Sequence, residues 1–311
     1  MNFMGVISMK AKYKISSTKK TKHGKKITKE DLKKQAEEVN ESEDAIPFIL
    51  DNNYNIPPIG KMVSAELVED GEDDYTLEVL IQFYDGEKKI ENCEEDLYKL
   101  INRSDKRPYI RTFENKNANI FTVYYDYSSF KEKDLEKLLD KSDKIAEAEI
   151  YGDRSIIPAP VTIFSIGSIE QLGYKFEDKK IDKIYDDLSD KLLKGINELI
   201  PEIIEKINRE NNEPAFMFKT DDDIQLEFVI QSDDYELIEN SLKNIHDCID
   251  EVEDYLKDYD IDIIQFRIDK DNPSWYFNYL IDSVGEVVCK KETLKKITGM
   301  MMEVGRRKSR M

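Results

Sequence analysis

The sequence has few of the residues from which metal and redox sites are built. Its three cysteines, Cys93, Cys248 and Cys289, are far apart and form no C-x-x-C pair, so neither a zinc site of the usual spacing nor a disulfide framework can be recognised. We expect all three thiols to be reduced and mostly buried. His23 and His246 are the only histidines, which excludes a site that needs several imidazole ligands. The sequence therefore predicts no metal and no cofactor.

Glycine is also scarce, and long apolar runs are missing. The 12 glycines are scattered, so no glycine-rich phosphate loop is present. No run reaches the roughly 20 apolar residues that span a bilayer. The first letters, "MNFMGVISMKAKYK", lack the apolar region and cleavage site of a signal peptide. These absences predict a cytoplasmic protein without a membrane partner.

Charge, in contrast, is abundant and unevenly distributed. The formal net charge is -19, yet residues 10–34 contain eleven lysines against Glu30 and Asp31, and the tail "GRRKSRM" carries four further positive charges. The remaining residues therefore hold a net charge of -32. Such an acidic body repels phosphate backbones, so we expect nucleic acid to be attracted only by the basic ends. An alternative is that the acidic body mimics DNA and inhibits a DNA-binding protein.

The hydrophobic pattern predicts an α+β fold, because 311 residues of which 40% are apolar are enough for two cores. We expect a β-rich N-terminal domain with short helices, then a long amphipathic helix and a C-terminal antiparallel sheet backed by helices. The predicted ranges are 1–45 for a basic N-terminal arm with a short helix, 46–175 for the β-rich domain, and 176–311 for the C-terminal domain with its basic tail.

Several elements can be predicted individually. Alternating apolar residues over 59–69 and 74–85 indicate a hairpin. The letters "CEEDLYKLIN", residues 93–102, are interpreted as a helix. Apolar residues recur every three or four positions over 178–209, which predicts a long amphipathic helix, and Pro201 inside it predicts a kink or a break. This helix is also a candidate interaction or dimerisation element.

Three neighbouring stretches between residues 18 and 85 resemble a known enzyme family. "KHGKKITKEDL", "AIPFILDNN" and "PPIGKMVSAELVEDG" are similar to the head-maturation (prohead) proteases of tailed phages. The resemblance implies a barrel shared with herpesvirus assemblins, in which a histidine after the first strand is the general base for a serine on a later strand. At the histidine position this chain has Asn52 or Asn53, and an amide cannot accept the serine proton. The later letters "FSIGS" make Ser165 the candidate nucleophile of a divergent serine hydrolase.

The asparagine-rich turn over residues 51–55 is similar to the start of a calcium-binding loop. Asp51, Asn53 and Asn55 occupy the first ligand positions of an EF-hand. Ile56 and Met62, however, stand where that loop requires glycine and glutamate, so the turn cannot enclose calcium in the usual way.

The only tryptophan lies in an aromatic strand. In "NPSWYFNYLIDSVGEV" one face of the strand is expected in the core, and Trp275 and Tyr276 are candidate contacts with a partner. With no complete catalytic set in the sequence, we expect a non-catalytic protein that binds or assembles with another protein or with itself. Composition and the phage resemblance suggest a phage, prophage or antiphage-defence system.

Overall fold

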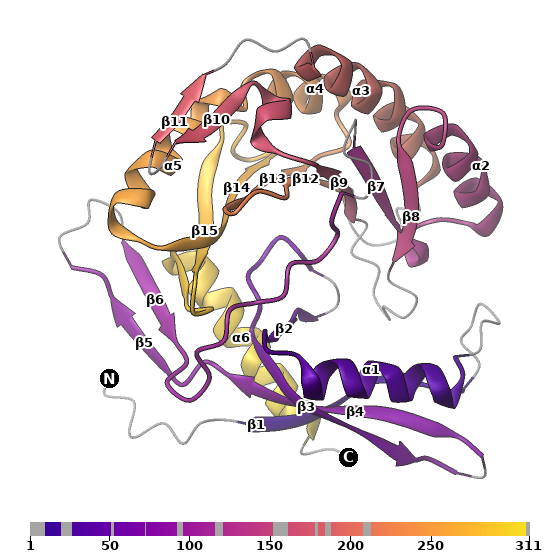
Figure 1. Cartoon of the computed structure of the whole chain (residues 1–311). Coiled ribbons are helices and arrows are strands. Elements are labelled where there is room, and N and C mark those ends of the chain that lie inside the picture. Colours follow the sequence, from indigo (N-terminus) through magenta and orange to yellow (C-terminus); the bar gives the residue numbers. More distant parts are fainter. Residues whose placement is uncertain are drawn as a thin grey trace. The chain divides into compact units, whose positions relative to one another are not determined.

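The structure is a computed structural model with two compact units (Figure 1). Unit 1 comprises residues 1–50, 56–110 and 283–311, and unit 2 comprises residues 51–55 and 111–282. The residues that the structure describes are 10–19, 27–50, 53–71, 73–91, 96–115, 121–151, 161–177, 180–183, 188–207 and 213–308. Both units combine helices with sheets, which confirms the predicted α+β class.

The units differ from the domain ranges expected from the sequence. The expected boundary between residues 175 and 176 falls inside unit 2, because strands before and after it pair in one sheet. Unit 1 in turn contains both an early and a late part of the chain. A sequence-based division into consecutive ranges cannot represent such an arrangement.

Unit 1 contains a four-stranded antiparallel sheet and a helix that covers it. In order across the sheet, its strands are β1 (Lys10–Ser17), β4 (Tyr75–Phe83), β3 (Gly60–Glu69) and β2 (Ile46–Phe48). The hairpin predicted over 59–85 is therefore confirmed. Helix α1 (Lys29–Glu41) contacts β3 and buries Leu32, Ala36 and Val39. It begins with a capping box, in which Thr28 and Asp31 each accept a hydrogen bond from the other's backbone N–H.

The basic N-terminal arm is partly a strand. Lys12 of β1 forms ion pairs with Glu78 on the neighbouring strand β4 and with Glu66 on β3, and Lys14 Nζ lies 3.7 Å from a carboxylate oxygen of Asp70. The letters "KAKYKI" alternate lysine with apolar residues, which is the pattern of an edge strand with one solvated face. Residues 10–17 thus belong to the fold of unit 1, and the range 1–45 contains this strand in addition to the expected short helix.

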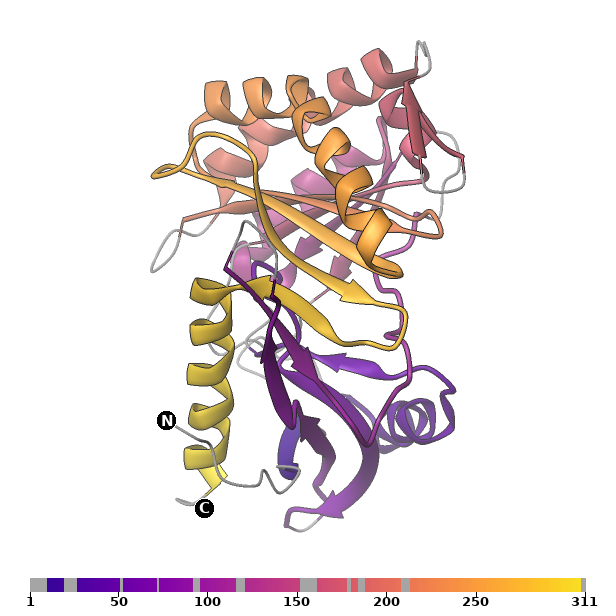
Figure 2. The ribbon, with the colours of Figure 1, turned by 90° about the vertical axis from the view of Figure 1, so that its left-hand side faces the viewer.

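Three further strands of unit 1 pair antiparallel with one another, in the order β5 (Gly86–Lys89), β6 (Leu97–Ile101) and β16 (Val287–Lys290). Helix α6 (Lys291–Lys308) contacts β1, β6 and β16 (Figure 2). The helix predicted over 93–102 is wrong in the described residues. Leu97 and Leu100 are buried three positions apart, as in a helix, but β6 pairs on both sides and these ladders determine its conformation.

Unit 2 contributes seven neighbouring strands to a mixed sheet. In order, they are β15 (Tyr276–Asp282), β14 (Ile261–Asp269), β13 (Gln225–Gln231), β12 (Ala215–Thr220), β9 (Val161–Ile166), β7 (Phe121–Asp126) and β8 (Glu147–Tyr151). Parallel pairs, β13 with β14, β9 with β12 and β7 with β8, alternate with antiparallel ones. The sheet is thus not antiparallel throughout, because each parallel pair is joined by a helical connection.

Helices back one side of this sheet, as expected (Figure 1). They are α2 (Glu132–Ser142), α3 (Leu188–Lys206), α4 (Tyr235–Lys243) and α5 (His246–Asp258). Helix α3 is shorter than the predicted 178–209, because a small hairpin of β10 (Tyr174–Glu177) and β11 (Lys180–Lys183) precedes it.

Helix α3 is part of the core of unit 2. Its apolar stripe is buried, with Ile196, Leu199 and Ile203 each exposing at most 1% of their surface. Of the two outcomes predicted at Pro201, the break is wrong, since α3 continues through this residue and is buried on either side, and the kink stays a prediction. Because the stripe is inside the unit, this face of α3 is not an interaction surface.

Candidate functional site

Six polar side chains form a continuous row across the sheet of unit 2. Each lies on a different strand, directly opposite the next in the strand register. From β7 to β15, this polar row consists of Thr122, Ser165, Lys219, Glu227, Gln265 and Tyr279. All six side chains are buried. Because a buried polar or charged group is costly unless it finds a partner, the partners of the row determine what it can do.

The polar row faces away from the helices. Side chains alternate along each strand, and Tyr125, which points the other way from Thr122, exchanges a hydrogen bond with Ser142 of α2. Beside the row is an apolar cluster on which the rings of Tyr54 and Phe113 pack. The carbonyl oxygens of Tyr54 and Thr112 accept hydrogen bonds from Gln265 and Lys219. Short non-strand segments around residues 54 and 112 thus cover this face of the sheet.

Ser165, a member of the polar row, is hydrogen-bonded to the carboxylate of Asp221. Its hydroxyl donates to Asp221 Oδ2 at 3.0 Å, and the other oxygen of Asp221 is 2.9 Å from Lys219 Nζ. The Lys219 ammonium also donates to the carbonyl of Thr112 at 2.6 Å and to Gln225 Oε1 at 3.3 Å. Lys219 therefore has three acceptors for its three protons, and Asp221 lies between it and Ser165.

Glu227 occupies the middle of the row. Its carboxylate accepts hydrogen bonds from Gln225 Nε2 at 2.6 Å, from Gln265 Nε2 at 2.7 Å and from the Tyr279 hydroxyl at 3.2 Å. Burial raises the pKa of Glu227, while these hydrogen bonds and the charge of Lys219 oppose the rise. The pKa of Tyr279 is also raised well above its usual value, by burial and by the neighbouring Glu227. The Glu227 carboxylate is thus stabilised by side chains of the same sheet.

This geometry does not assemble a serine nucleophile with a base. A serine hydroxyl becomes nucleophilic when a neutral imidazole or amine can take its proton. The partner of Ser165 is a carboxylate, and the nearby amine is engaged as an ammonium donor. His246 lies at the exposed start of α5, where its imidazole pairs with Asp247, and His23 lies outside the described residues.

The described cysteines are also unsuited to act as nucleophiles. Cys248 and Cys289 are free thiols in the core, as expected, and Cys93 lies outside the described residues. Burial raises the pKa of Cys289 to about 12 and that of Cys248 well above its usual value, so neither thiol is a thiolate at neutral pH. Within the part of the chain that the structure describes, no group of three or more potential ligands could hold a metal ion.

The aromatic partner candidates make contacts within unit 2. Trp275 Nε1 donates to the carbonyl of Ser241 at 3.2 Å, and its ring meets Phe228 edge-on. The Tyr276 hydroxyl donates to Asp269 at 2.8 Å. Both side chains are half-buried, so their role as partner contacts stays a prediction. In the asparagine-rich turn, Asn53 Oδ1 accepts the N–H of Asn55, a local turn contact, while Asp51 and Asn52 lie outside the described residues.

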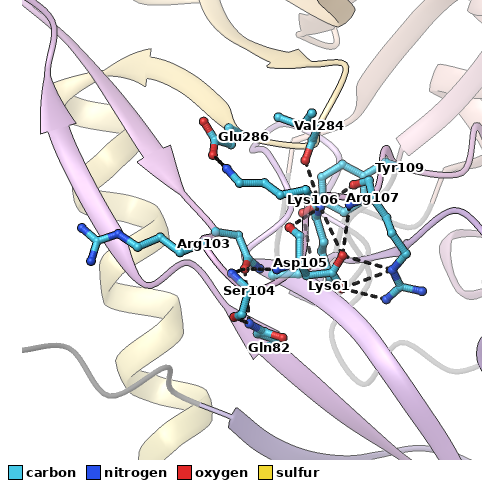
Figure 3. A network of polar contacts seen from close by, with 12 residues as sticks. Lys61, Gln82, Arg103, Ser104, Asp105, Lys106, Arg107, Tyr109, Val284 and Glu286 are labelled. Atoms are coloured by element: carbon cyan, nitrogen blue, oxygen red, sulfur yellow. Dashed lines mark hydrogen bonds and ion pairs between the residues drawn. The ribbon is translucent and has the colours of Figure 1, made fainter.

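A separate buried network holds unit 1 together around Lys61 of β3 (Figure 3). The Lys61 side chain is fully buried, and its ammonium donates to the carbonyls of Asp105, at 3.0 Å, Val284, at 3.1 Å, and Arg107. The Asp105 carboxylate, 3.8 Å from Nζ, supplies the compensating charge. One lysine thus ties β3 to two turns distant in the sequence, which is a structural role.

Gly285 is required beside this lysine. Its φ of +70° is in the left-handed region that favours glycine, and a Cβ there would lie 2.7 Å from Lys61 Nζ. The turn before β16 can approach the ammonium only because position 285 has no side chain.

Two surface features of unit 2 remain. A groove of about 590 Å³ between α2 and α3 is lined by both acids and lysines, and Glu202 there binds Lys141 and Lys206. Hydrogen bonds from Lys206 and Lys141 lower the pKa of Glu202 to about 2.

The second surface feature is Ile150 on β8, which exposes 45% of its surface. Among the described large hydrophobic side chains, only Met302, at 48%, is likewise exposed.

Comparisons with models of known families, with curated proteins and with solved structures gave no match. No helix among the described residues is long and apolar enough to cross a membrane.

The polar row has a sequence signal that was missed. Three strands contain one polar residue between large apolar neighbours, in "FSI", "LEF" and "IQF", and in a fourth, "FKT", a lysine directly follows a phenylalanine. A lysine or glutamate in such a position cannot face the same way as its apolar neighbours, because side chains alternate along a strand. Repetition of this pattern indicates a polar line on one face of a sheet, although it does not give the register.

Proposed function

We propose that this chain works by binding another protein, through the outer edge of β8. The observation that carries the proposal is Ile150, a large apolar side chain that is 45% exposed on the last strand of the sheet of unit 2. Among the described strands, β8 pairs only with β7, so its other edge presents backbone N–H and C=O groups. An extended segment of a partner can pair with such an edge.

The polar row supports a non-catalytic role. A nucleophile has to be reachable by substrate, whereas Ser165 exposes 0% of its surface and its hydroxyl is already bonded to Asp221. We interpret the row as the element that fixes strand register in unit 2. The resemblance to prohead proteases then concerns ancestry rather than activity, and the serine hydrolase remains the rival hypothesis.

The DNA-mimic alternative has one observation in its favour. Helix α5 exposes Asp247, Asp250, Asp254 and Asp258 along one face, spaced three or four residues apart. Two of these four are paired within the helix, Asp247 with His246 and Asp254 with Lys257. A DNA-binding protein would recognise this face through basic side chains, and its complex would be strongly salt-sensitive.

The proposal is tested by affinity capture from cells of the source organism, with the tagged full chain as bait. We expect the wild type and Ser165→Ala to recover the same protein in stoichiometric amount. Ile150→Lys should reduce recovery at least about tenfold, which corresponds to about 1.4 kcal/mol of binding free energy. Met302→Lys is the matched control, because Met302 is as exposed as Ile150 but lies on α6 of unit 1.

Other outcomes of the same capture identify the alternatives. Equal recovery by the Ile150→Lys and Met302→Lys variants would contradict binding at β8. Recovery of a DNA-binding protein that is lost on raising the salt, irrespective of Ile150, would favour the DNA mimic. A bait that recovers nothing but reacts at Ser165 with a fluorophosphonate probe would favour the serine hydrolase.

A further inference from the structure

We propose that the segment bound at β8 is an extended strand in which lysine or arginine alternates with apolar residues. This inference rests on the proposed function, which it deepens by naming the chemistry of the partner. It follows from the two faces of β8, from the charges on one of them and from an equivalent pairing elsewhere in the chain.

The two faces of β8 differ in chemistry. Glu147 and Glu149 are opposite Thr122 and Tyr124, so they share the face of the polar row. Ala148 and Ile150 share the other face, on which α2 lies. Burial, together with the charges of Glu149 and Glu147, raises the pKa of Tyr124, which fits carboxylates close to that ring on one face. The edge therefore presents acids on one side and apolar groups on the other.

A strand added beside β8 must match this alternation. Side chains of neighbouring strands that are directly opposite share a face, so residues opposite Glu147 and Glu149 would lie beside two carboxylates. Lysine or arginine is favourable there, and apolar residues are favourable beside Ile150. A second β8 strand would place glutamate beside glutamate, which argues against symmetric pairing of two copies through this edge.

Unit 1 contains a pairing of this kind. Strand β1, with the letters "KAKYKISS", is the last strand of its sheet and pairs antiparallel with β4. Its Lys12 forms ion pairs with Glu78 of β4 and with Glu66 of β3, and its Ala11 is buried. An alternating lysine strand on an acidic neighbour is thus a stable arrangement in this chain, and the peptide of residues 10–17 has the chemistry that we propose for the partner.

The test is a titration of the fluorescently labelled peptide KAKYKISS into the full chain at low salt, followed by fluorescence anisotropy. We expect saturable binding that weakens at least tenfold with Ile150→Lys and with the double variant Glu147→Lys/Glu149→Lys. The charge-reversed peptide EAEYEISS should not bind, and Met302→Lys should leave the affinity unchanged. Glu66→Gln is a further control. Glu66 pairs with Lys12 of β1, so this change should weaken binding only if the peptide displaces β1 in unit 1.

The outcomes separate this inference from the proposed function. Binding that is unaffected by both β8 variants, or that is weakened by Glu66→Gln alone, overturns the inference. If capture from cells depends on Ile150 while the peptide does not bind, protein binding at β8 stands and the basic alternating partner is wrong. If capture is independent of Ile150 and the peptide also fails, both proposals fall.

Discussion

Replacing Lys61 with methionine is expected to lower the free energy of unfolding of unit 1 by about 3–5 kcal/mol, the cost of removing one partner from a buried ion pair. Methionine fills similar space but donates no hydrogen bond, so the carbonyls of Asp105, Arg107 and Val284 lose a common donor. The Asp105 carboxylate keeps its contacts with Arg107 but loses the buried ammonium.

Urea unfolding followed by far-UV circular dichroism measures this effect. Lys88→Met is the matched control, since Lys88 is exposed on β5 of the same unit. Fluorescence of the single tryptophan, Trp275, reports on unit 2 and separates the two units. A Lys61→Met transition that coincides with that of Lys88→Met would contradict the structural role of this lysine.

Replacing Lys219 with methionine is expected to destabilise unit 2 by a similar amount, about 3–5 kcal/mol. The change leaves Asp221 without its ammonium partner and removes the positive charge beside Glu227. It also leaves the carbonyl of Thr112 without this donor inside the unit. Trp275 fluorescence during urea unfolding measures the loss directly, with Lys191→Met on the exposed side of α3 as the control.

The loss of unfolding free energy in Lys219→Met should grow as the pH rises. A carboxyl group whose pKa is raised in the folded state stabilises the fold below its unfolded pKa, and this contribution is lost as the pH rises through the folded value. Burial raises the pKa of Glu227, and Lys219 limits that rise. In Lys219→Met the carboxyl should ionise at still higher pH, so the penalty relative to wild type should grow as the pH rises. A penalty that shrinks with rising pH would show that Glu227 and Lys219 are not coupled.

Local patterns predicted much of unit 1. The hairpin over 59–85 was predicted from alternation, because that pattern depends on residues close in sequence, and the capping box of Thr28 and Asp31 at the start of α1 is a local pattern of the same kind. Strand β6 was missed for the opposite reason. Its conformation is set by pairing with β16, which lies about 190 residues later in the chain.

The candidate site was only partly predictable. Ser165 was recognised from its letters, but its role depends on Asp221 and Lys219, and these meet it only through the parallel register of β9 and β12. Sequence periodicity places Lys219 on one face of a strand without giving the neighbour across it. The role that we propose for β8 could not be predicted from its letters either, because they do not give the position of the strand in the sheet order.

Hydrogen–deuterium exchange of the full chain, alone and with the partner recovered by capture, tests protein binding at β8 most directly. Backbone pairing with an added strand protects amide groups that are otherwise open to water. We predict that the complex slows exchange within Glu147–Tyr151 and leaves the strands that carry Ser165 and Lys219 unchanged. Unchanged exchange in β8, with protection confined to β9 and β12, would contradict this account and point to the polar row as the ligand site.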